Sequence, residues 1–228
     1  MQIDTVDAMP DPKLVLAFAV VLVAVLIGLG TSRQLTRRPR QDSRVEANAR
    51  LTGYVAVVLL VPLAAEIITG VRPGLLAHAL IGIGLLPLVL LKLGSVGYRF
   101  VRYYAGDPGY RAAGPPQPVT RLLGPVVVVL TVVLFATGVE LWLFGFQLGE
   151  EWLTWHKLAF AAWFPAMTIH VVAYLRRAPE LAIADTRDRL RGAFERRSLI
   201  IGSLLLGAAL AVAMLPFASP FTLLPNVG

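Results

Sequence analysis

Cysteine is absent from this chain of 228 residues, and histidine is scarce, with three residues. Without thiols the chain can form no disulfide, iron–sulfur cluster, thiolate zinc site or covalent c-type haem attachment. Charged residues are also few, at 15%, whereas hydrophobic residues make up 57% and the mean hydropathy is +0.70. This balance excludes a soluble globular domain and predicts an all-α integral membrane protein.

Six apolar segments are long enough to cross a bilayer, which takes about 20 helical residues. They cover approximately residues 13–30, 51–70, 74–96, 122–146, 153–175 and 198–216. The N-terminus "MQIDTVDAMPDPK" is acidic, and no small-residue cleavage site follows the first segment. We therefore expect the first segment to be a retained helix and not a signal peptide.

Positive charge is concentrated in three links between these segments. Residues 31–50, 97–121 and 176–197 hold 17 of the 21 Lys and Arg residues. Six spans place the three links on one side, so the positive-inside rule puts them in the cytoplasm and both termini outside, in a bacterial-type plasma membrane. The net charge of +7 is thus a topology signal, and we expect a lipid bilayer and no nucleic acid as partner.

The segments divide the chain into three parts. Residues 1–50 hold the first helix and a basic link, residues 51–177 a central bundle of four helices, and residues 178–228 a surface segment and the last helix. The surface segment "PELAIADTRDRLRGAFERRS" is either a solvated link or a short helix on the membrane surface. A helix would bring three apolar residues near one face: Ile183, Leu190 and Phe194.

The third and fifth segments align without a gap. Residues 78–92 read "HALIGIGLLPLVLLK" and residues 156–170 read "HKLAFAAWFPAMTIH". Both begin with His, carry Leu at +2 and Pro at +9, and end at +14 with a nitrogen base. A shared His, Pro and terminal base at fixed offsets indicate an internal duplication. The prolines, Pro87 and Pro165, can bend both helices.

The spacing of the bases predicts two layers in the membrane. Fourteen residues are about four helical turns, so the two bases of each helix share one side and lie about 21 Å apart. Both helices cross in the same direction, so His78 and His156 share the outer depth while Lys92 and His170 share the inner depth. Such pairs suit b-type haem, which is held noncovalently by axial ligands, usually imidazole. We predict an outer iron ligated by His78 and His156, and an inner one ligated by His170, with Lys92 as the candidate second ligand.

Residues nearby fit the same hypothesis. Gly124 and Gly138, again fourteen apart, leave room for a bulky ring on the fourth segment. Arg99 and Arg102 lie one to three turns beyond the inner bases and can hold the carboxylates of a haem, although such residues are more often positive-inside anchors.

Segments two to five resemble the four-helix haem bundle of cytochrome b in the quinol–cytochrome c reductase, whose second and fourth helices each carry two histidines fourteen apart. His78, His156 and His170 carry the match, whereas Lys92 replaces the fourth histidine. The stretches "LLKLGSVGYRFVRYYAGDPGYRAAGPP" and "WHKLAFAAWFPAMTIHVVAYL" are also similar to bacterial cytochrome-b-like membrane proteins. The resemblance covers residues 51–177.

The resemblance implies one or two haem b groups and transmembrane electron transfer, with a quinone or a redox subunit as partner. The chain would then be an electron-transfer cytochrome or a subunit of an oxidoreductase. The Pro-Glu-Trp-Tyr motif of quinol oxidation in the reductase is missing, so no Q-cycle role follows.

Several alternatives stay open. Lys92 can ligate iron as a neutral amine, pair with a haem carboxylate, or extend its ammonium to the membrane surface. Glu66 and Glu140, each beside a Thr-Gly step, are either proton-relay or quinone-pocket carboxylates or interfacial ones. The whole chain could instead be a small transporter or channel, or a haem-free scaffold. One zinc ion cannot join His156 and His170, which lie about 21 Å apart.

Overall fold

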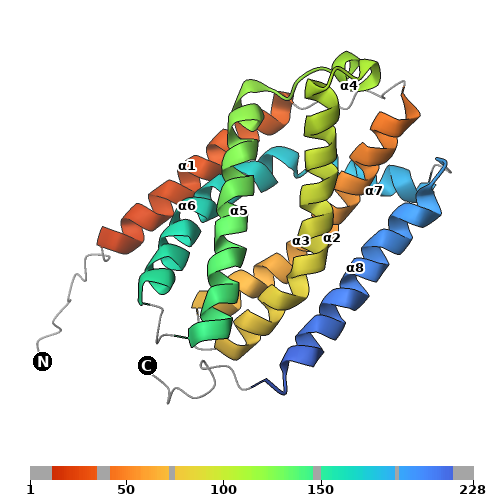
Figure 1. Cartoon of the computed structure of the whole chain (residues 1–228). Helices are drawn as coiled ribbons and strands as arrows, with labels where there is room; N and C mark the ends of the chain where they lie inside the picture. The colour runs from red at the N-terminus through yellow and green to blue at the C-terminus, as the bar shows by residue number, and fades with distance from the viewer. Residues whose placement is uncertain (1–11, 35–41, 72–74, 146–149, 188–189, 218–228) are drawn as a thin grey trace, which may run out of the picture.

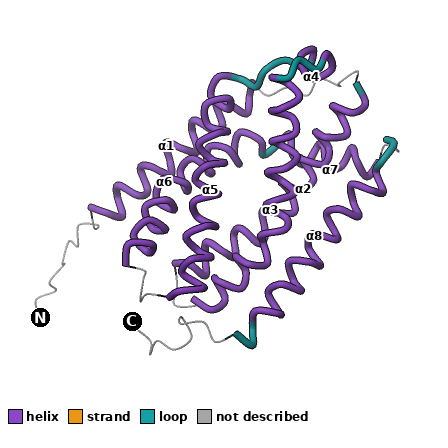
Figure 2. The backbone as a smooth tube through the Cα atoms, in the orientation of Figure 1, coloured by secondary structure: helices purple, strands orange, loops and turns teal. Residues whose placement is uncertain are grey.

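The computed structural model describes residues 12–34, 42–71, 75–145, 150–187 and 190–217 (Figure 1). Throughout these ranges the protein is all-helical, with eight helices and no strand (Figure 2). Six of the helices are long and apolar enough to span a membrane, which confirms the predicted class. They are α1 (Pro12–Gln34), α2 (Ser43–Val71), α3 (Leu75–Tyr104), α5 (Pro118–Phe144), α6 (Glu150–Tyr174) and α8 (Ala193–Met214).

Several helices extend beyond the apolar segments that predicted them. Helix α2 begins at Ser43, where Glu46 and Arg50 form an ion pair one turn apart, at 3.0 Å, that supports the added turns. Helix α3 continues to Tyr104, through aromatic and basic residues that follow its apolar segment. Polar pairs and interfacial aromatics can therefore lengthen a helix past the hydrocarbon core.

The spanning helices pack as two hairpins with one further helix beside each. Helices α2 and α3 pack together, as do α5 and α6, while α8 lies against α3 and α1 against α6. The main apolar core lies where α2, α3 and α8 meet, around Val55, Leu88 and Ile200. The α3–α8 approach is close: a Cβ on Gly207 would overlap the Gly84 carbonyl, so glycine is required there.

Proline lies inside each helix of the two hairpins: Pro62, Pro87, Pro125 and Pro165. Each proline removes a backbone amide from the helical ladder and allows a bend. Helix α8 contains none, and the one proline of α1 stands at its first residue. The helices that can bend are thus the four around the cavity described below.

The predicted surface helix is present as α7 (Arg177–Arg187), but its predicted apolar face is wrong. The buried residues of α7 are Leu181, Ala182, Ala184 and Asp185, and the helix packs against α2. Ile183 is exposed instead, and Phe194, 80% exposed, belongs to α8. An ion pair overrode the apolar pattern, because Asp185 turns inward to meet two arginines of α8.

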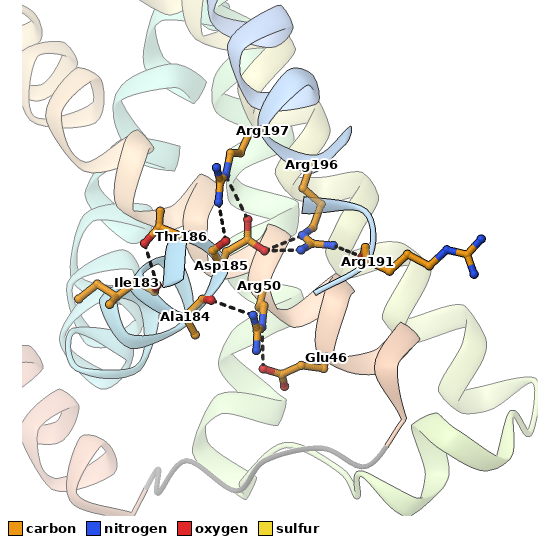
Figure 3. Close-up of polar contacts among 9 residues, drawn as sticks. All are labelled: Glu46, Arg50, Ile183, Ala184, Asp185, Thr186, Arg191, Arg196 and Arg197. Carbon is orange, nitrogen blue, oxygen red and sulfur yellow. Dashed lines mark hydrogen bonds and ion pairs between the residues drawn. The ribbon is translucent and has the colours of Figure 1, made fainter. Parts of the chain in front are cut away.

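These contacts tie α7 to both of its neighbours (Figure 3). The Asp185 carboxylate accepts hydrogen bonds from Nε, at 2.8 Å, and Nη2 of Arg196, and Arg197 Nη2 donates to the Asp185 carbonyl at 2.7 Å. From α2, Arg50 Nη1 donates to the Ala184 carbonyl at 2.8 Å while its Nε bonds Glu46. We call these five residues, Glu46, Arg50, Asp185, Arg196 and Arg197, the Asp185 cluster.

A short helix, α4 (Pro108–Ala112), follows α3 at the arginine-rich end (Figure 1). Asp107 caps it by accepting hydrogen bonds from the amides of Gly109 and Tyr110, at 3.0 and 3.2 Å, and pairs with Arg102. Desolvation raises the pKa of Asp107, but the amide bonds and Arg102 together outweigh it and hold the pKa below its ordinary value.

Candidate functional site

A cavity of about 1420 Å³ lies between the two hairpins. Helices α2, α3, α5 and α6 supply most of its lining, and neither α1 nor α8 contributes a residue among the described ones. Sites for drug-sized ligands occupy about 300–1,000 Å³, so this cavity can hold more than one such group. Its lining is mainly apolar, with a small number of polar side chains that include all three histidines.

Two of those histidines face each other across the cavity, His78 from α3 and His156 from α6. Their ring centroids are 6.2 Å apart and their planes are at 87°. Two imidazoles that bind one metal ion from opposite sides, with each nitrogen at about 2.0–2.1 Å, have centroids roughly 6 Å apart. The separation of the rings therefore matches what a shared metal ion between them requires.

Hydrogen bonds define the tautomer of both rings. His78 Nδ1 lies 3.0 Å from the Glu66 carbonyl oxygen, so Nδ1 donates. His156 Nδ1 lies 2.8 Å from the Thr137 hydroxyl, whose own hydrogen is donated to the carbonyls of α5 one turn back. When the hydroxyl donates to either carbonyl, it accepts from His156. Both rings then carry the proton on Nδ1 and leave the Nε2 lone pair available to a ligand.

The partners of the two histidines repeat between the hairpins. Thr69 on α2 and Thr137 on α5 both bond their Oγ1 to the carbonyls four and three residues earlier. The glycine after each threonine faces the histidine of the same hairpin: a Cβ on Gly70 would lie 2.9 Å from His78 Cε1, and one on Gly138 would lie 3.6 Å from His156 Cε1. A Thr-Gly step thus lies beside each histidine, and in the second hairpin its threonine also bonds the ring, as its spacing alone did not reveal.

Glu66 lies beside the outer pair on the α2 side. Its Oε1 is 3.3 Å from His78 Nδ1, and Gly82 gives it space, because a Cβ there would lie 2.9 Å from the same oxygen. Its Oε2 is buried and has no hydrogen-bond partner among the described residues. Glu140, the other predicted carboxylate, does not line the cavity.

The inner bases lie in the same cavity, closer to the arginine-rich end. His170 packs against Tyr174 with ring centroids 5.0 Å apart, and its Nδ1 is buried with no hydrogen-bond partner in the described part of the chain. Lys92 is near enough for its charge to act on His170, and its Nζ donates to the Thr52 carbonyl at 2.6 Å. The Lys92 amine therefore bonds inside the bundle.

The remaining predicted residues separate into two groups. Gly124, Gly138 and Arg99 all line the cavity, and the Cβ position of Gly124 faces open space. Arg102 does not line it, because its guanidinium is turned to Asp107 at the start of α4. Two further cations that the repeat did not indicate, Arg121 and Arg177, also line the arginine-rich end of the cavity.

These residues fit haem better than a bare metal ion. Within the described ranges no group of three or more His, Cys, Asp or Glu side chains could hold a metal ion. A macrocycle brings its own in-plane nitrogens, so it needs only two axial donors from the protein, and His78 and His156 offer two. The cavity also has the volume and the apolar lining that a large flat ring requires.

Comparison of the chain with protein-family models, curated proteins and solved structures finds no significant match.

Proposed function

We propose that this protein is a b-type cytochrome that transfers electrons across a membrane, as a subunit or partner of a quinone-linked oxidoreductase. The observation that carries the proposal is the His78–His156 pair, with ring centroids 6.2 Å apart and both Nδ1 atoms hydrogen bonded. Six apolar helices supply the membrane setting. In this reading the arginine-rich links face the cytoplasm and both termini lie outside.

Each residue of the outer site has a defined task. His78 and His156 would hold the iron through Nε2, while the Glu66 carbonyl and the Thr137 hydroxyl hold the two rings in place and raise their basicity. When bound, haem supplies a one-electron redox couple that the side chains of this chain lack. The apolar walls keep water from the site, and such exclusion is one of the levers by which a protein adjusts a haem potential.

A second site at the other depth would extend the path. His170, with Lys92 beside it, is the donor that the cavity offers there. The two depths are about 21 Å apart along a straight helix, a large part of the roughly 30 Å hydrocarbon core. The sequence contains no nucleotide-binding motif, so a quinone or another subunit would exchange electrons with the chain.

The test is a dithionite-reduced minus oxidised spectrum of the detergent-purified protein, with pyridine haemochrome quantification of haem per chain. We expect one or two haems per chain in the wild type. His78→Ala and His156→Ala should each remove the outer haem, while His170→Ala should spare it. A colourless wild-type protein, after expression with haem supplied, would contradict the proposal.

A transport path is the second candidate, because one cavity connects polar groups at both depths, among them Glu66, His78, Lys92 and His170. Ionisable residues inside a membrane often mark proton or ion routes. Proton flux into liposomes loaded with a pH-sensitive dye would support this candidate if the protein carries no haem. If the protein shows neither bound haem nor proton flux, the remaining alternative is a haem-free scaffold.

A further inference from the structure

The arginine-rich end of the cavity differs in charge from the opposite end. Four cationic residues line it: Lys92, Arg99, Arg121 and Arg177. Of the described residues that line the cavity, Glu66 is the one carboxylate, and it lies against His78 at the other end. The arginine-rich end thus has several positive charges and no acidic side chain in its lining.

Two of these cations have no partner in the part of the chain that the structure describes. Neither the Arg99 nor the Arg177 side chain makes a hydrogen bond or an ion pair there, and both line the same end of the cavity. In contrast, Lys92 is bonded to the Thr52 carbonyl, and Arg121 lies 3.4 Å from the Tyr104 hydroxyl. Two adjacent like charges in an apolar setting need an anion to offset their desolvation.

The cavity is also open to the side at this end. Phe100 and Val101 on α3 and Leu122 and Val129 on α5 line the cavity, yet each is more than half exposed. A residue that lines the cavity and also faces outward marks an opening, here between α3 and α5. In a membrane that opening faces acyl chains, so the ligand that can enter is itself a lipid.

We propose that an anionic phospholipid binds here, with its phosphate at Arg99 and Arg177 and an acyl chain along the apolar wall between α3 and α5. Charge complementarity selects the headgroup, since basic pockets between helices at the cytoplasmic side recognise anionic lipids. A guanidinium suits this task because its planar fork of donors matches phosphate oxygens. This site uses neither of the outer histidines and does not depend on the electron-transfer proposal.

Native mass spectrometry of the full-length protein with added phosphatidylglycerol or phosphatidylcholine tests the proposal. We expect the wild type to retain phosphatidylglycerol preferentially. The double variant Arg99→Gln/Arg177→Gln should lose that preference by roughly tenfold or more, since each cation near an anionic lipid contributes measurably to binding. The matched control Arg111→Gln/Arg187→Gln removes two exposed cations that do not line the cavity and should keep the preference.

Three results would overturn the proposal. The first is equal retention of both lipids by the wild type, a measurement that does not depend on whether any variant folds. The second is an equal loss of preference in the control, which would indicate general attraction to the basic surface. The third is a normal lipid preference in Arg99→Gln/Arg177→Gln together with a reduced haem content, which would assign the arginines to haem carboxylates. Arg99→Lys/Arg177→Lys keeps both charges and should retain the lipid.

Discussion

The Asp185 cluster and the histidine pair are two polar regions of one apolar bundle, and they differ in which of their polar atoms have partners within the protein. In the first, a carboxylate that is 1% exposed faces two guanidiniums, and Arg50 has both Glu46 and a backbone carbonyl. In the second, His78 and His156 are each held at Nδ1 but have no hydrogen bond at Nε2 within the described chain. The charges of the first cluster are paired within the protein, although Asp185 Oδ2 and Arg197 Nε make no hydrogen bond among the described residues. In the second region, Nε2 of both histidines is left available to a group from outside.

Asp185→Asn tests the first half of this comparison and should have the largest effect. The change keeps the size of the side chain but leaves Arg196 buried and next to Arg197 without a counter-charge. Breaking a buried pair in this way costs about 3–5 kcal/mol. We expect thermal unfolding in detergent, followed by circular dichroism, to occur at a clearly lower temperature.

Asp42→Asn is the matched control, because its ion pair with Arg44, at 3.2 Å, is largely exposed. Its free energy of unfolding should change little, because solvent screens an exposed pair. If both substitutions destabilise the protein equally, the Asp185 cluster is not the tie between α7 and α8 that its burial indicates.

Thr137→Val tests the second half of the comparison. Valine keeps the shape but removes the hydroxyl that accepts from His156 Nδ1. Loss of such an outer partner lowers metal affinity about 10- to 100-fold, so haem should be lost more readily to apomyoglobin while protein stability changes little. Thr168→Val, whose hydroxyl bonds only its own helix at Phe164, should behave as wild type. Equal rates of haem loss in both variants would remove Thr137 from the site.

Glycine substitutions sharpen the comparison between the two hairpins. A Cβ at Gly70 would press on His78 at 2.9 Å, whereas one at Gly138 would meet His156 at an ordinary 3.6 Å. Gly70→Ala should therefore weaken haem retention by about 1 kcal/mol, or roughly fivefold, after the helical preference of Ala offsets part of the overlap. Gly138→Ala should leave haem retention unchanged. The reverse order in the same assay would contradict this geometry.

The smallest effect concerns Asp107, outside the spanning helices. Its pKa is lower in the folded protein than the ordinary value near 4, so its contribution to stability is present above that value and is lost as pH falls through the lowered pKa. In Asp107→Asn, the unfolding temperature should therefore decrease less between about pH 4 and pH 2 than it does in the wild type. If the variant and the wild type show the same decrease in unfolding temperature at acidic pH, the charge of the Asp107 cap does not contribute to stability.

Much of the architecture could be predicted because hydropathy and charge act locally. Long apolar runs identified the six spans, and the matched offsets of His78 and His156 placed both residues at one depth, where the structure brings them together. Contacts between distant segments could not be derived in this way. The inward turn of Asp185 depends on Arg196 beyond the next link, and the place of Arg177 in the cavity lining depends on how α7 folds back.

The contacts of individual side chains within the site were harder to predict than the depth of each residue along its helix. Arg102 has the right position on α3, yet Asp107 is available to it just past the helix end. The threonines beside Gly70 and Gly138 were visible as a repeated dipeptide, and only the packing of the hairpins showed that each Thr-Gly step faces a histidine.

The equivalence of the two hairpins has a consequence in terms of symmetry. Each consists of a helix with a Thr-Gly step and a following helix with an early histidine, and both hairpins cross in the same direction. Parallel repeats of this kind are related by rotation about an axis along the membrane normal. The paired rings lie between the two units, where such an axis would pass. A two-helix peptide carrying one Thr-Gly step and one histidine could thus form the same pair as a cyclic homodimer, with one ligand from each copy.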